Sequence, residues 1–321
     1  MSIDTPAPGK AKDEVTAARI KAEKMPFGRW MRVVGWRHVV AIIVVIWALF
    51  PAFYVITLAF SGGNTLTGAC PPDRQGLAAL TCLVPNKLSL DNFTAILTST
   101  QWPFAVWFRN TVILATLNSF LALLMGACAA FAFSRLRFKG RRMGLLLLML
   151  VQMFPAVLAL TAIFILLQSI GEVFPPFGLR SIWGLLLVYL GGALGVNTFL
   201  MKGYFDTIPV DLDESARIDG AGHVKIFFGL IMRLALPILV VVFFVSFAST
   251  FNELPMAQQI LPDPDNTTLA VGLNSLVSNP LLQQWGLMAA GGLMAAIPLL
   301  IVFAITQRSL TTGLTAGAVK G

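Results

Sequence analysis

Several signatures of catalysis are missing from the sequence. It has no G-x-x-x-x-G-K-[ST] loop, the usual cradle for nucleotide phosphates, so a nucleotide site of that type is excluded. The only histidines, His38 and His223, stand alone and lack the spacing of metal ligands. We therefore expect no catalytic residue, no metal and no cofactor in this chain, and a role other than that of an enzyme.

Charge is scarce. Charged residues make up 12% of the 321 residues, hydrophobic residues make up 57%, and the mean hydropathy is +0.79, which excludes a soluble domain. A run of about 20 apolar residues crosses the roughly 30 Å of a bilayer core. The sequence predicts an all-α, polytopic membrane protein with six spans, at residues 38–60, 110–134, 143–168, 181–201, 228–250 and 284–306.

Ionisable residues are nearly absent from the middle of these runs. Arg109, Arg233 and Glu253 all fall near span ends, where snorkelling or contact with lipid headgroups accounts for them. This argues against an ion-driven secondary carrier, which needs charges within the membrane or a repeated half.

Uncharged polar residues and prolines do occur within the spans. For the polar residues, hydrogen bonding between helices is favoured over contact with a ligand. The prolines predict breaks in spans three, five and six that act as hinges or as simple kinks. The polar residues are Asn118, Ser119, Gln152, Gln168 and Asn197, and the prolines are Pro155, Pro237 and Pro298.

The positive residues cluster in two places, which predicts the orientation because positively charged loops stay in the cytoplasm. Loops 61–104 and 251–283 hold few or no positive residues and are expected outside, so both termini are expected inside. The net charge of +8 then reflects topology and lipid contact rather than binding of nucleic acid. The clusters are Lys10, Lys12, Arg19, Lys21, Lys24, Arg29, Arg32 and Arg37, and Arg135, Arg137, Lys139, Arg141 and Arg142.

Two of the three cysteines, Cys70 and Cys82, lie in the first external loop. An oxidising compartment favours a disulfide between them, and two free thiols are the alternative.

A charged segment, residues 211–224, interrupts the apolar runs between spans four and five on the expected cytoplasmic side. Asp211 is expected to cap a short helix with acidic residues in its first turn. Gly220 is expected to end that helix in a left-handed conformation. The product is a protrusion that is apolar through Ala216 and Ile218 and charged around its rim, a shape suited to a partner's cleft. An ordinary loop between two spans is the alternative.

The order of features from about Asn92 to Gly321 resembles the second membrane subunit of carbohydrate ABC importers of the maltose type. Four pieces carry the resemblance: FRNTVILATLNSFLALLMGACAAFAFSRLRFKGRR at 108–142, the E-A-A-like segment around Glu214, DNTTLAVGL at 265–273 and QRSLTTGLTAGAVKG at 307–321. The sequence departs from the family pattern in two places. Ser215 replaces an alanine, and Arg233 stands near a usual proline, with Pro237 four residues later.

The resemblance implies the type I ABC importer permease fold and a division of the chain into a cytoplasmic arm (1–37), a six-span domain (38–306) with cytoplasmic coupling helices (206–226), and a cytoplasmic tail (307–321). It implies contact with an ATPase through one set of residues and places the tail along the interface of the ATPase pair. The first set is Asp213, Glu214, Ser215, Ala216, Ile218, Asp219, Gly220 and Pro237, and the tail set is Gly313, Leu314, Thr315, Ala316, Gly317, Lys320 and Gly321.

The implied function is transport of a maltose-, maltodextrin- or trehalose-like oligosaccharide into a bacterial cell across its inner membrane. ATP and magnesium would sit on the partner subunits. The implied partners are a sister permease, two copies of the ATPase, an external sugar-binding protein and membrane lipid. The alternatives are a permease for another carbohydrate-type solute such as glycerol phosphate, a secondary carrier, and a structural or assembly protein of the membrane.

Overall fold

The computed structural model describes residues 31, 35–63 and 88–318, and these residues form helices and loops without a strand. The chain divides into two compact units, residues 1–55 and 56–321. Helix α3 (Trp36–Ala59) covers the predicted first span; it has 24 residues and a mean hydropathy of 2.8, enough to cross a membrane.

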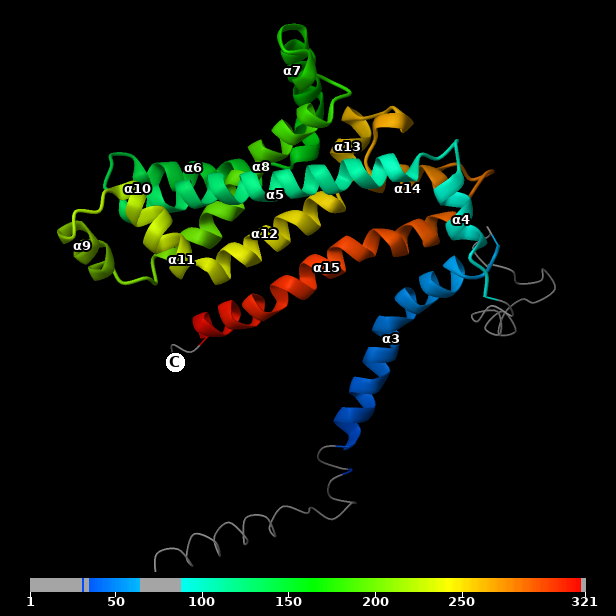
Figure 1. Ribbon diagram of the computed structural model, residues 1–321, viewed down its shortest axis with the longest axis horizontal. Helices are drawn as coiled ribbons and strands as arrows, with labels where there is room; N and C mark the ends of the chain where they lie inside the picture. Colours follow the sequence, from blue (N-terminus) through cyan, green and yellow to red (C-terminus); the bar gives the residue numbers. More distant parts are fainter. Residues whose placement is uncertain (1–30, 32–34, 64–87, 319–321) are drawn as a thin grey trace, which may run out of the picture. The chain divides into compact units, whose positions relative to one another are not determined.

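Three long helices form the centre of the second unit: α5 (Phe104–Arg135), α8 (Ile182–Phe205) and α12 (Leu236–Phe251). Helix α5 packs along both α8 and α12, and α15 (Trp285–Ala318) packs along α12 (Figure 1). Helices α5 and α8 approach closely at Gly126, where an added Cβ would lie 2.5 Å from Cε of Met201. Small residues allow such close approach between membrane helices. Helices α5, α8 and α15 confirm three further predicted spans by their length and composition.

The predicted third span is divided. Helix α6 (Arg141–Met153) ends before Pro155, a short 3₁₀ turn η3 (Ala156–Ala159) follows, and α7 (Leu160–Val173) continues the chain. Each helix is about 20 Å long at 1.5 Å per residue, which is shorter than the bilayer core. Proline interrupts the helical hydrogen-bond ladder, so an apolar run that reads as one span contains two helices.

The predicted fifth span is also broken, by a bend of 80°. Helix α10 (His223–Ile226) passes through a π-helical stretch, η5 (Phe227–Ile231), into α11 (Met232–Leu234), and α12 begins after Ala235. Pro237 lies in the first turn of α12, where its missing N–H costs no hydrogen bond. Pro298, in contrast, lies inside the continuous helix α15. Length and composition thus give four spans, or five if the bent pair counts as one, and the predicted six are not reached in the described part.

The end of the bundle opposite α9 carries five short elements: α4 (Asp91–Thr98), η4 (Pro175–Phe177), α13 (Pro255–Ile260), η6 (Pro264–Asn266) and α14 (Leu269–Ser278). Three side chains at the start of α5 hold the chain leading into α14. Trp107 Nε1 donates to the carbonyl of Pro264 (2.6 Å), Asn110 Nδ2 donates to that of Thr267 (3.1 Å), and Thr111 Oγ1 accepts from the amide of Leu269 (2.7 Å). These bonds hold the segment DNTTLAVGL, residues 265–273, against the start of α5.

Several predictions fall where the structure gives no description. Most of the arm 1–37 lies outside the described residues, as do Cys70, Cys82, Lys320 and Gly321. The backbone of α15 is helical through Ala318, so most of the predicted tail, including Gly313 to Gly317, continues the last helix.

Candidate functional site

The α9–α10 segment, residues 211–226, lies at the end of the bundle where α5 finishes (Figure 1). Helix α9 (Asp211–Ile218) ends in a turn in which the amides of Gly220 and Ala221 donate to the carbonyls of Arg217 and Ala216, both at 2.9 Å. Gly220 has φ +81°, a left-handed conformation that a Cβ disfavours. The sequence prediction of a short helix terminated by Gly220 agrees with this geometry.

The expected helix cap differs. Helix α9 begins at Asp211 itself, Val210 precedes it, and no side chain caps the first amides. Asp211, Asp213 and Glu214 all lie in the first turn, where carboxylates complement the positive end of the helix dipole. Asp211 therefore contributes charge to the first turn rather than a capping hydrogen bond.

Asp213 points inward and forms a buried ion pair. Its Oδ2 lies 2.8 Å from Nε of Arg135, the last residue of α5, and the two side chains are 2% and 5% exposed. A terminal nitrogen of Arg135 also donates to the carbonyl of Ile208 (2.8 Å). Oδ1 of Asp213 is buried without a hydrogen-bond partner among the described residues. The guanidinium thus ties α5 to both the start of α9 and the chain just before it.

This placement changes the predicted surface. Asp213 is buried, and Ala216 is half-buried against the cluster that includes Phe131, Phe205 and Phe227, so these two residues anchor the segment to its own bundle. The apolar side chains that remain outside are Ile218 (87% exposed), Val224 (72% exposed) and, to a smaller extent, Leu212 (41% exposed). Glu214, Ser215, Asp219 and Gly220 are also exposed. The segment presents three exposed apolar residues among charged ones.

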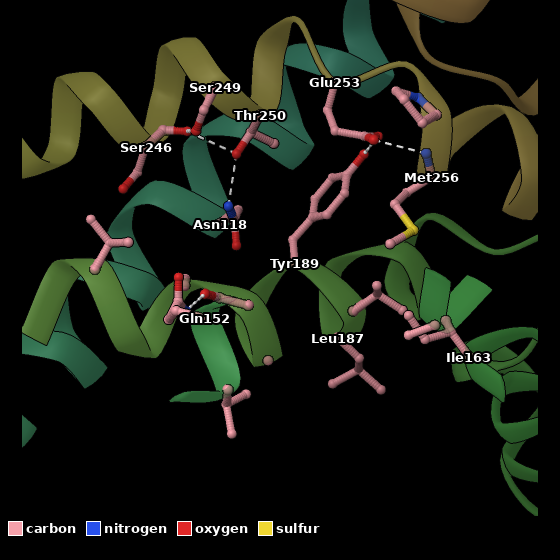
Figure 2. Close-up of a pocket in the computed structure, with 18 of the residues that line it drawn as sticks. Asn118, Gln152, Ile163, Leu187, Tyr189, Ser246, Ser249, Thr250, Glu253 and Met256 are labelled. Atoms are coloured by element: carbon pink, nitrogen blue, oxygen red, sulfur yellow. Dashed lines mark hydrogen bonds between the residues drawn. The ribbon is translucent and has the colours of Figure 1, made fainter. Parts of the chain in front are cut away.

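A cavity of about 910 Å³ opens nearer the middle of the same bundle, between α5, α6, α7, α8, α12 and α13 (Figure 2). The apolar side chains of its lining include Phe154, Ile163, Leu187 and Met256. Its polar side chains come from α5, α6, α8 and α12 and from the turn after α12. They are Asn118, Gln152, Tyr189, Asn197, Ser246, Ser249, Thr250 and Glu253.

Polar side chains in this cavity bond between helices, as the sequence analysis favoured. Asn118 Nδ2 donates to Thr250 Oγ1 (2.7 Å), and Asn197 Nδ2 donates to Ser246 Oγ (3.2 Å). Gln152 Nε2 reaches from α6 to the carbonyl of Gly192 in α8 (2.8 Å). The same residues line the cavity, so the side chains that join the helices also form part of the cavity wall.

Glu253 follows the end of α12 and was expected to contact lipid headgroups. Instead its Oε1 accepts from the amide of Met256 (2.8 Å), and its Oε2 accepts from the amide of Ala257 (3.0 Å) and from the hydroxyl of Tyr189. The carboxylate therefore holds the first turn of α13 and joins it to α8, as Figure 2 shows. No sequence signal indicated this role, because neither Tyr189 nor the turn at 253–257 belongs to a motif.

Comparison with known proteins identifies similar chains over most of this length. A family model described as "Binding-protein-dependent transport system inner membrane component" matches residues 120–312. The maltose/maltodextrin transport system permease protein MalG of Vibrio vulnificus is 38% identical over 273 residues, which cover 85% of this chain and 91% of that protein. The maltodextrin transport system permease protein MdxG of Bacillus subtilis is 36% identical over the same shares.

The fold has a counterpart among solved structures. A crystal structure of a bacterial ABC transporter involved in the import of the acidic polysaccharide alginate contains a chain that superposes with a TM-score of 0.70. The two chains are 24% identical, and the match covers 89% of this chain and all of the other. The likeness supports an ABC importer permease architecture for the helices described above.

Proposed function

Since the chain belongs to the family of binding-protein-dependent transport system inner membrane components, we propose that it is the permease subunit through which an oligosaccharide enters the cell. The relatives named for maltose and maltodextrin transport support a neutral glucose-based solute, of the maltose, maltodextrin or trehalose type. Family membership argues against the secondary carrier and the purely structural protein. ATP is hydrolysed by partner subunits.

The α9–α10 segment is the docking element for the ATPase. The observation that carries this proposal is the exposure of Ile218 and Val224 on a short helical protrusion whose inner side is locked by Arg135 and Asp213. Exposed apolar residues rimmed by charge mark surfaces that a partner covers. The exposed Glu214 would meet a positive group on the ATPase.

The distribution of positive charge supports a cytoplasmic position for the proposed ATPase contact. Arg135 closes α5 at the end of the bundle that carries α9, and four more positive residues follow in the next loop (Arg137 and Lys139) and at the start of α6 (Arg141 and Arg142). Residues 251–283, at the other end, hold no lysine or arginine. Positive charge marks the cytoplasmic face, which supports a cytoplasmic position for the α9–α10 segment, within reach of a soluble ATPase.

The complete importer contains this chain, a sister permease, two copies of the ATPase and an external sugar-binding protein. ATP binding closes the ATPase pair. The α9–α10 segment of this chain and the corresponding segment of the sister permease transmit that closure to the membrane helices. The pathway then opens alternately to the two sides of the membrane. The tail, from Gly313 onward, is the second contact that we propose with the ATPase pair, at its interface.

Replacing Ile218 with aspartate tests the docking element. The change puts a charge into an apolar contact, so we expect the ATPase to be lost when the importer is purified in mild detergent through a tag on this chain. Mass spectrometry of the co-purified subunits is the measurement, and the sister permease should remain.

Leu281→Asp is the matched control, because Leu281 is 90% exposed in the loop between α14 and α15, at the other end of the bundle. This variant should retain the ATPase. Retention of the ATPase by Ile218→Asp would contradict the proposed docking element, and its absence from the wild-type preparation would contradict the proposed function.

A further inference from the structure

We propose that the turn between α5 and α6, residues 136–142, binds an anionic phospholipid of the phosphatidylglycerol or cardiolipin type together with the exposed face of α6. The phosphate of the lipid lies against the positive side chains of the turn, and an acyl chain lies along the helix. The site is separate from the proposed ATPase contact. Its position in the cytoplasmic leaflet rests on the proposed function, because both follow from the same orientation.

Three contacts hold this turn against the end of α5. The rings of Phe133 and Phe138 pack with their centroids 5.6 Å apart. An added Cβ at Gly144 would lie 3.2 Å from Cε1 of Phe133, so the first turns of α6 lie close to α5. A terminal nitrogen of Arg141 donates to the carbonyl of Ser134 at 3.4 Å. The turn is therefore a folded surface rather than an extended linker.

The turn presents three exposed positive side chains, Arg137, Lys139 and Arg142. None of them takes part in a salt bridge among the described residues. No aspartate or glutamate occurs in the sequence between Asp91 and Glu172. Uncompensated positive charge attracts an anion, and arginine and lysine are the side chains that bind phosphate groups. The turn is thus suited to a phosphate that comes from outside the chain.

Two acidic residues of neighbouring elements, Asp206 and Asp213, already have partners. Asp213 is buried against Arg135. Asp206 accepts from the hydroxyl of Ser134 at 2.6 Å and pairs with Lys202. The start of α6 adds to the positive potential, because no side chain caps its first amides and the positive end of the helix dipole lies there.

An apolar stripe continues from the turn along the exposed face of α6. Its four side chains follow the spacing i, i+3, i+4, i+7, which places them on one side of a helix. Positive residues at one end of an apolar stripe match a lipid, which joins a charged headgroup to apolar chains. A soluble anion would contact the turn alone and leave the stripe uncovered. The four side chains are Met143, Leu146, Leu147 and Leu150, and each is 53–61% exposed.

Photo-crosslinking of the assembled importer in nanodiscs tests this site. The nanodiscs consist of phosphatidylcholine with a trace of a phospholipid whose acyl chain is photoreactive and whose headgroup is either phosphatidylglycerol or phosphatidylcholine. Peptide mapping by mass spectrometry identifies the labelled residues. We expect the phosphatidylglycerol probe to label residues 143–150, and the phosphatidylcholine probe to label them at least about tenfold less, because its headgroup carries no net charge.

The double variant Arg137→Gln with Arg142→Gln removes two of the three exposed cations. Each cation beside an anionic lipid strengthens binding about fivefold, so labelling by the phosphatidylglycerol probe should fall about 25-fold. Arg137→Lys with Arg142→Lys keeps the charge and should keep most of the labelling. The matched control, Arg109→Gln with Arg180→Gln, removes two exposed cations at the other end of the bundle and should be labelled like the wild type.

Co-purification of the ATPase with each variant checks that the importer is folded and assembled. Three results would overturn the lipid site: equal labelling by the two probes, unchanged labelling of the glutamine variant, or loss of labelling when inorganic phosphate is added at constant ionic strength. The third would assign the turn to a soluble anion.

An unlabelled stripe in an importer that retains its ATPase would also overturn the proposal, because the sister permease would then cover α6. Each of these four results leaves the proposed function standing. Labelling of residues 143–150 in a preparation that lacks the ATPase would support the lipid site and contradict the proposed function.

Discussion

Replacing Arg135 with alanine is expected to abolish transport and to destabilise the chain by about 3–5 kcal/mol, because the change leaves the buried carboxylate of Asp213 without its cation. The α9–α10 segment then loses its tie to α5, and closure of the ATPase no longer moves the helices that line the cavity. Uptake of labelled maltose by the reconstituted importer and thermal unfolding of the purified chain are the two measurements.

Two controls separate the ion pair from general damage. The double variant Arg135→Leu with Asp213→Leu replaces both charges with apolar groups, and we expect it to recover most of the lost stability. Lys202→Ala breaks the partly exposed pair with Asp206 at the same end of the bundle and should cost less than about 1 kcal/mol. If Arg135→Ala melts like Lys202→Ala, the buried pair does not hold the segment.

Gly272→Ala is expected to have the second largest effect. An added Cβ would lie 2.2 Å from two ring carbons of Trp107, whose side chain is fully buried. The ring cannot move aside without breaking its hydrogen bond to the carbonyl of Pro264. Overpacking of this kind costs about 1–3 kcal/mol or more, so we expect a lower unfolding temperature and a poor yield of monodisperse protein.

Gly203→Ala provides the matched control for this prediction. Gly203 is also helical, in α8, but it is exposed and no heavy atom lies within 4 Å of an added Cβ. Alanine favours the helix over glycine by up to about 1 kcal/mol, so this variant should be as stable as the wild type or more stable. The same substitution is thus expected to act with opposite signs at the two positions, and a shared sign would contradict the packing argument.

Apolar length predicted the helical class and four spans, since each of these helices carries enough hydrophobic residues to be read without knowledge of its neighbours. It did not predict where helices break. The prolines predicted two of the breaks, because Pro155 separates α6 from α7 and Pro237 follows a bend at Ala235, but they also predicted a break at Pro298, where α15 is continuous. Hydropathy measures the preference for lipid, whereas continuity of a helix depends on local hydrogen bonds.

The turn at Gly220 was predictable because a positive φ favours glycine, and a glycine after a short charged helix is visible in the sequence. The pairing of Arg135 with Asp213 was not. Arg135 belongs to a run of positive residues that membrane orientation already explains. Asp213 belongs to an acidic first turn that the helix dipole already explains. Tyr189 and Glu253 were missed for a related reason, since contacts between distant elements carry no local pattern.

The Arg135–Asp213 pair also imposes an order on biosynthesis. Arg135 is translated before α6, α7 and α8, and Asp213 is translated after them. The guanidinium therefore has no carboxylate of this kind to meet until the ribosome has completed these elements. A growing chain stopped within them would lack the proposed ATPase-binding surface, so we expect the ATPase to bind only a permease in which α6, α7 and α8 have been made.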